Sequence, residues 1–211
     1  MNPLRVLNGV CALNGKDALA ASSDELGPLY SLAADGKTTR PIELTIPGTK
    51  GRDPLVLQSS LASNRDGTAC VVAMAFGNGL SLWNGAAFTR VARYREDIAF
   101  PVPIMNTRMQ MTPTGERKVT FPTMPHRAIE SALGVAMVPG RVRVLFEGGT
   151  ANKGRIIDDY DDRTLEYLGS ILLPTPVTEF TAPTSDMIVM VAKRNGFPML
   201  VALRQRPEPA Q

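Results

Sequence analysis

The sequence predicts an all-β fold built from repeated four-stranded antiparallel units. Short apolar runs alternate with turn sequences along the whole chain. The 18 glycines and 17 prolines punctuate these runs and do not gather in one linker. Corresponding segments recur at a spacing of roughly 50 residues, which is typical of a repeat protein.

The clearest unit spans residues 61–91 and contains four short apolar runs. Turn sequences at residues 64–67, 77–79 and 84–85 separate these runs. Asn-Gly and related pairs between apolar runs are strong hairpin signals. The segment therefore predicts one antiparallel meander, which belongs to a unit at about residues 55–95 that begins with the run at 55–57.

An earlier unit at about residues 9–46 has the same organisation. Asn14 precedes Asn64 by 50 positions, and Leu29 precedes Leu80 by 51. Its last part, residues 38–46, alternates apolar and polar side chains and predicts a strand.

Two further units are predicted at about residues 131–173 and 177–206. The last unit has only three strand-like runs, whereas residues 4–7 form a spare run at the N-terminus. In a closed ring of units, this N-terminal run would supply the missing outer strand and protect the exposed edge. Residues 1–206 are then one domain, and residues 207–211 are predicted to be a disordered tail.

The regular pattern fails at residues 100–130, which we interpret as an insertion or a degenerate unit. Proline occurs five times between residues 101 and 125, and methionine four times between 105 and 124. The short runs around Ile104 and at residues 119–121 could be strands, but regular central strands are not expected here because proline cannot donate to a β-ladder. We expect long loops instead, and long insertions on a rigid scaffold often carry function.

Charge and cysteine content set limits on the function. The net charge is +3 and the pI about 9.0, but basic residues are scattered, so nucleic-acid binding has little support. No apolar run is long enough to predict a membrane span. We interpret Cys11 and Cys70 as two separate buried side chains, with one disulfide between them as the alternative.

Residues 158–174 resemble a known family. They are similar to its pattern of a strand ending in Tyr-Asp, a turn, Tyr-Leu-Gly-Ser and then Leu-Pro, and residues 186–191 and 198–201 resemble its closing blade. The family is that of the bacterial six-bladed β-propellers of the NHL/TolB-like type. The resemblance implies a propeller, here short, with four to five blades or a partial ring, and an extracytoplasmic location. A β-sandwich is the fallback fold.

Candidate binding residues lie in the insertion. They are methionines suited to adaptable contacts, basic side chains and the single histidine: Met105, Arg108, Met109, Met111, Arg117, Lys118, His126 and Arg127. The competing interpretation is a loop packed over its own core. His126 is interpreted as a loop or surface residue, since a role as general base would need a partner such as Glu130.

No catalytic residues are predicted, because no catalytic motif is found. Four carboxylates are weak candidates for calcium binding: Asp158, Asp159, Asp161 and Asp162. Their spacing does not fit an EF-hand, and a solvated hairpin turn is the simpler interpretation. No cofactor is otherwise predicted.

We therefore favour a non-enzymatic propeller that binds a protein partner or associates with itself. The alternatives are a metal-dependent, lactonase-like propeller hydrolase and a structural subunit whose edges neighbouring chains complete. The hydrolase would need its carboxylates at the ends of inner strands.

Overall fold

The computed structural model describes residues 7–13, 17–22, 28–33, 35, 39–149 and 151–205. These residues form seventeen strands and one short 3-10 helix. The predicted closing strand at the N-terminus lies, except for Leu7, outside the described residues, and so does the predicted tail at 207–211.

The first two sheets each contain four antiparallel strands in sequence order. The first consists of β1 (Leu7–Cys11), β2 (Ala18–Ser22), β3 (Leu29–Leu32) and β4 (Thr39–Pro41). The second consists of β5 (Ser59–Ser63), β6 (Cys70–Met74), β7 (Leu80–Trp83) and β8 (Phe88–Ala92).

In the remaining two large sheets the strands are again antiparallel and in sequence order. The third consists of β11 (Ala132–Val138), β12 (Arg141–Phe146), β13 (Ile156–Tyr160) and β14 (Tyr167–Leu172). The fourth has three strands, β15 (Val177–Thr184), β16 (Met187–Arg194) and β17 (Phe197–Arg204).

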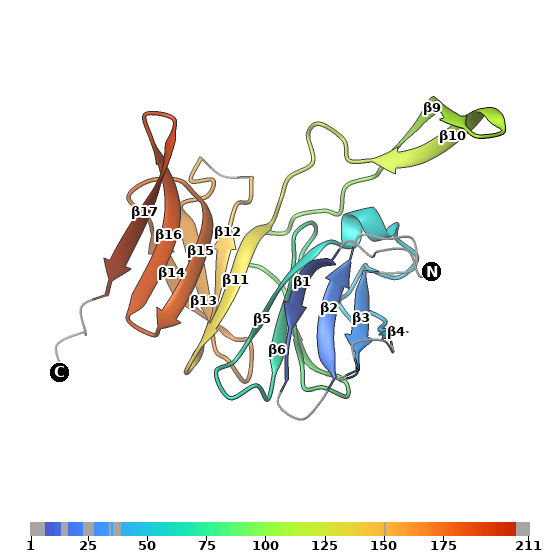
Figure 1. Cartoon of the computed structure of the whole chain (residues 1–211). Helices are drawn as coiled ribbons and strands as arrows, with labels where there is room; N and C mark the ends of the chain where they lie inside the picture. The colour runs from blue at the N-terminus through green and yellow to red at the C-terminus, as the bar shows by residue number, and fades with distance from the viewer. Residues whose placement is uncertain are drawn as a thin grey trace, which may run out of the picture.

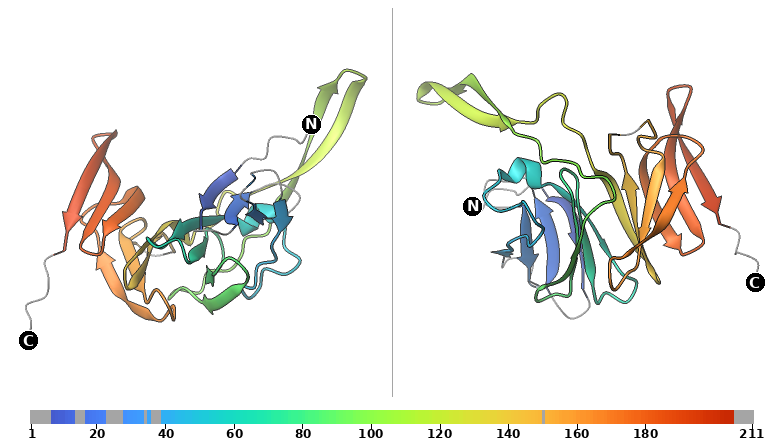
Figure 2. Two further views of the ribbon diagram at one scale, coloured as in Figure 1. Left: turned by 60° about the horizontal axis from the view of Figure 1, so that its bottom comes forward. Right: turned by 180° about the vertical axis from the view of Figure 1, so that it is seen from behind.

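The four sheets form a curved row, with the first and fourth sheets at opposite ends (Figures 1 and 2). Their first strands lie side by side in the order β1, β5, β11 and β15. This arrangement of four-stranded meanders around one side of an axis is that of a partial β-propeller. The predicted propeller is thereby confirmed, and the β-sandwich alternative is wrong because the sheets do not form two facing layers.

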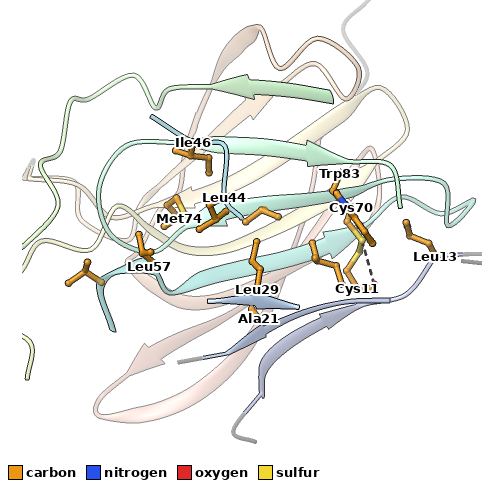
Figure 3. Close-up of a cluster of buried hydrophobic side chains, with 13 residues drawn as sticks. Cys11, Leu13, Ala21, Leu29, Leu44, Ile46, Leu57, Cys70, Met74 and Trp83 are labelled. Carbon is orange, nitrogen blue, oxygen red and sulfur yellow. Dashed lines mark hydrogen bonds between the residues drawn. A yellow bond between two sulfur atoms is a disulfide. The ribbon is translucent and has the colours of Figure 1, made fainter. Parts of the chain in front are cut away.

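Apolar cores fill the spaces between successive sheets. Strand β6 shows why the sheets stack, because all five of its residues are buried. Cys70, Val72 and Met74 point into the core shared with the first sheet (Figure 3). Val71 and Ala73 point into the core shared with the third sheet. A third core, which contains Leu145 and Ile188, joins the third and fourth sheets.

Asx turns connect several strands, as the sequence indicated. Asn84 Oδ1, between β7 and β8, accepts hydrogen bonds from the backbone N–H groups of Ala86 and Ala87. Asp161, at the equivalent place between β13 and β14, accepts from the N–H groups of Thr164 and Arg163. These two bonds lower the pKa of the Asp161 carboxyl. The turns form from local side-chain chemistry, which is why the sequence reveals them.

Two predicted segments fold differently. The strand expected at residues 38–46 is short, because β4 ends at Pro41; Leu44 and Ile46 leave the sheet but remain buried. The run at 55–57 forms the 3-10 helix η1 (Pro54–Leu57) before the first strand of its unit. Asp53 caps this helix by accepting a hydrogen bond from the Leu55 N–H.

A disulfide joins Cys11 at the end of β1 to Cys70 at the start of β6. It links the first sheet to the second within their shared core (Figure 3). The interpretation as two separate buried side chains is therefore wrong. Sequence could not decide the matter, because the residues are 59 positions apart and only the packing of the two sheets brings their Cα atoms to 6.2 Å.

A buried arginine joins the third sheet to the fourth. Arg143 on β12 is fully buried and donates from Nε to Asp159 Oδ1 at 3.2 Å. Its Nη2 group donates to the Ser185 carbonyl at 2.8 Å and to Gln205 Oε1 at 2.7 Å. Ser185 follows β15 and Gln205 follows β17, and both lie at the same end of the fourth sheet, where the Gln205 N–H donates to the Asp186 carbonyl. One side chain therefore holds this end of the fourth sheet against the third.

We expect loss of the disulfide to destabilise the fold. Cys11→Ala combined with Cys70→Ala should lower the free energy of unfolding by about 4 kcal/mol, because a loop of this length is no longer closed in the unfolded chain. Urea titration followed by the fluorescence of buried Trp83 measures the change. A reducing agent should destabilise the native protein and leave the double variant unaffected. Equal stability of the two oxidised proteins would contradict the prediction.

Arg143→Leu should lower the free energy of unfolding by about 3 kcal/mol, because it leaves a buried carboxylate and two acceptors without this donor. Thermal and urea unfolding measure the loss. Lys153→Ala is the matched control, since it removes an exposed pair whose Nζ lies 3.5 Å from Glu147. That change should cost at most about 1 kcal/mol. Similar losses in the two variants would show that Arg143 is not a clamp between sheets.

Candidate functional site

The insertion between the second and third sheets forms a long hairpin, which we call the arm. It consists of β9 (Ile104–Thr112) and β10 (Gly115–Thr123). The strands pair without a bulge from Ile104 with Thr123 to Thr112 with Gly115. Figures 1 and 2 show the arm extending away from the four sheets.

The expectation of long loops at residues 100–130 is wrong for this part of the chain. Pro122 lies inside β10 opposite Met105. Proline is tolerated because each strand of a two-stranded sheet has one edge that needs no partner. The turn sequence Thr-Pro-Thr-Gly at residues 112–115 is the feature of the sequence that indicates this hairpin.

The arm has two different faces, because side chains alternate along a strand and directly paired residues share a face. On one face Met105, Met109 and Met111 lie with Lys118. On the other face, the Arg108 guanidinium lies 5.0 Å from the centroid of the Phe121 ring.

The methionine face is open to solvent. Met105 is 61% exposed, Met109 60% and Met111 74%. Every residue of β9 except Thr112 is exposed. A two-stranded hairpin is only marginally stable in water without a third strand or a packing surface. The arm therefore presents flexible apolar side chains that its own chain does not cover.

The base of the arm is anchored in the body of the protein. Phe100, before β9, and Met124, after β10, both pack against the core between the first and second sheets. The Phe100 ring occupies the space beside Gly77, where an added Cβ would lie 2.5 Å from the ring. The Arg52 guanidinium covers this ring at 4.6 Å from its centroid. The arm thus has a fixed base and a free tip.

The structure places six of the eight predicted binding residues on the arm and divides them between its faces. Arg117 and Lys118 are neighbours in sequence and therefore lie on opposite faces. His126 and Arg127 follow the arm in an exposed loop. In the part of the chain that the structure describes, no hydrogen bond or ion pair joins His126 to Glu130, so nothing supports His126 as a general base.

A separate cavity of about 380 Å³ lies where the second sheet meets the third. Sequence reasoning missed it, because its lining comes from four segments that only the fold brings together. The lining residues are Arg95, Glu96, Phe146, Ile156, Asp158 and Ser170.

The four candidate metal carboxylates do not share one hairpin turn. The interpretation as a solvated turn is therefore wrong for Asp158 and Asp159. Asp158 and Asp159 are buried in β13, and only Asp161 and Asp162 lie in the turn that follows it. Consecutive strand residues point to opposite faces, which separates Asp158 from Asp159. Strand β13 is third from the inner edge, not the inner strand that the hydrolase alternative requires. Among the described residues, no group of three or more metal-ligating side chains is gathered.

The two buried carboxylates have different surroundings. Arg141 Nη1 donates to Asp159 Oδ2 at 2.7 Å and Arg143 Nε to its Oδ1, so two cations compensate Asp159. Asp158 receives a hydrogen bond from Ser170 Oγ at 2.5 Å, and that hydroxyl lies 2.6 Å from the Tyr167 hydroxyl. In the described chain, no basic side chain lies within ion-pair distance of Asp158. Burial raises the pKa of Asp158, although Ser170 and the more distant Arg95 oppose the shift.

No known family model and no curated protein matches the chain. Among solved structures, it is similar to Saccharomyces cerevisiae Sqt1, with 10% identity, a TM-score of 0.46, and coverage of 92% of this chain and 43% of that one. It is also similar to the Cps50 (Swd1) beta-propeller domain of Myceliophteria thermophila, with 13% identity, a TM-score of 0.39 and coverage of 89% and 62%. A third similar structure is Myxococcus xanthus glutaminyl cyclase, with 15% identity, a TM-score of 0.30, and coverage of 95% of this chain and 90% of that one.

The chain thus spans less than two thirds of the first two of these structures. The fold assignment rests on the arrangement of the sheets described above. The NHL/TolB-like type and the bacterial origin stay predictions. No helix in the described segments is long and apolar enough to cross a membrane.

Asp158→Asn should stabilise the protein at neutral pH. The raised pKa of Asp158 means that the folded state favours its protonated form. The native carboxyl therefore contributes its full stability at low pH, and this contribution is lost as the pH rises through the raised pKa. Asparagine keeps the neutral shape and can still accept from Ser170. At pH 7 the unfolding temperature should rise by at least about 2 °C. The difference should shrink as the pH falls and should vanish at about pH 3, where aspartate is protonated in both states.

Thermal unfolding between pH 3 and pH 8 measures this difference. Glu166→Gln is the control, because Glu166 is exposed and lies outside the cavity lining. A lower unfolding temperature for Asp158→Asn at pH 7 would show that the carboxylate is compensated in the folded state.

Proposed function

We propose that this chain is a non-enzymatic assembly module that binds a partner protein through the arm. The proposal rests on one observation: the arm has nine-residue strands, and all three methionines on its methionine face are exposed. Such a hairpin gains stability when a partner covers it. Methionine suits this role, because its flexible side chain adapts to the surface it meets.

The charges on the arm indicate the kind of surface that fits it. Lys118 and Glu116 both lie on the methionine face, where their charges balance, whereas Arg108 and Arg117 lie on the opposite face. The partner surface should therefore combine an apolar groove for the methionines with acidic groups that reach the opposite face of the arm. Complementary charge of this kind contributes mainly to association rate and specificity.

A second surface favours the alternative of a structural subunit. The fourth sheet carries Leu200, which is 75% exposed, on the side opposite its core with the third sheet. Val189 and Val191 lie beside it around a shallow hollow. In the first three sheets, the corresponding side is covered by the next sheet of the chain. A neighbouring chain could cover this face, which makes Leu200 a useful point of comparison.

We expect the triple change Met105→Ser, Met109→Ser and Met111→Ser to weaken partner binding at least tenfold. Partners can be captured with a photo-crosslinking residue at position 109, purified, and titrated against the native and variant chains. A few side chains near the centre of an interface usually carry most of the binding energy, and truncating each of these costs more than about 1 kcal/mol. Exposed substitutions should leave folding stability within about 0.5 kcal/mol of native.

Leu200→Ser is the matched control, since it removes an equally exposed apolar side chain outside the arm. The proposal expects native affinity for this variant, and amide protection of residues 104–123 that increases only in the complex. Loss of binding in Leu200→Ser with retention in the triple variant would favour the structural subunit. Binding of the native chain to anionic lipid vesicles, with no protein captured, would overturn the proposal.

A further inference from the structure

The cavity between the second and third sheets contains a carboxylate at a position that its neighbours fill with apolar side chains. Asp158 lies opposite Val144, and Ile156 lies opposite Phe146 on the same face of the sheet. Val144 and Phe146 belong to the core that joins these sheets, and Ile156 packs against it. Asp158 is 2% exposed. A buried charge in such a row is costly unless a partner compensates it.

The fold provides that compensation for Asp159 but not for Asp158. Two arginines bind Asp159, which explains its burial as part of the link between sheets. Asp158 has the Ser170 hydroxyl as its hydrogen-bond donor. The position of Asp158 in the lining of a cavity of about 380 Å³ leaves room for a ligand group beside it. Small-molecule sites start at roughly this size.

The other lining residues restrict what can bind. Glu96 adds a second carboxylate, and its Oε1 is held by the Gly149 N–H at 3.0 Å. Arg95 brings one positive charge, but its guanidinium lies toward Tyr167, 5.8 Å from that ring's centroid. Phe146 and Ile156 supply apolar walls. The site therefore combines two carboxylates and one guanidinium, a net negative charge, with an apolar surface.

We propose that this cavity binds a small organic molecule that carries an ammonium group on an apolar body. The ammonium group pairs with Asp158, and the body packs against Phe146 and Ile156. A neutral ligand of the same shape leaves Asp158 without a cation, and an anion meets two carboxylates. This binding role is independent of the arm, which lies on another part of the connection between the sheets.

Phenethylamine is a suitable probe, and 2-phenylethanol is its neutral counterpart of nearly the same shape. Both are titrated at pH 7 into the native chain and three variants, with binding followed by amide chemical shifts. The native chain and Glu166→Gln should bind phenethylamine saturably, with shifts centred on residues 95–96, 156–158 and 170. Asp158→Asn should bind it at least tenfold more weakly, and the native chain should bind 2-phenylethanol at least tenfold more weakly.

Ser170→Leu provides a second test, because it extends a bulky side chain into the cavity from β14, where Ser170 is exposed. It should also weaken phenethylamine binding at least tenfold, and circular dichroism with thermal unfolding should show both variants folded. Equal affinity of native and Asp158→Asn protein would overturn the proposal. So would equal binding of the alcohol and the amine, shifts centred elsewhere, or no saturable binding up to millimolar concentrations.

Discussion

The burial of apolar side chains between successive sheets is the interaction on which the rest of the structure depends. A sheet such as the second one, with Val72 on one side and Val71 on the other, cannot be stable with either side in water. The second and third sheets must therefore each lie between two others, and the chain meets this requirement by stacking its meanders in sequence order. The disulfide and Arg143 add specific links at two of these interfaces, but apolar contact determines their order.

Local chemistry explains which parts of the fold were predictable. Asn84 and Asp161 produce turns through bonds to residues two or three positions away, so the sequence contains the whole interaction. The strands between them follow from apolar periodicity. The disulfide was not predictable, because Cys11 and Cys70 meet only after two sheets have packed. The predicted functional residues were found through composition, whereas their division between two faces depends on the register of β9 with β10.

The difference between Asp158 and Asp159 illustrates the same limit. The two residues are chemically identical and adjacent, and nothing in the sequence distinguishes them. The strand sends one toward the second sheet and the other toward the fourth. One meets two arginines and becomes part of the scaffold, and the other meets a cavity. Residue type alone therefore could not separate a structural carboxylate from one available to a ligand.

The long connection between the second and third sheets carries both candidate sites. Glu96 at its start lines the cavity, the arm occupies its middle, and Ser131 at its end donates a backbone hydrogen bond to the Ala75 carbonyl. Phe100 and Met124 return the chain to the same core on either side of the arm. Residues between them can accordingly diverge without disturbing any sheet interface. Over evolutionary time, such an insertion can acquire new binding preferences while the sheets stay under purifying selection for packing alone.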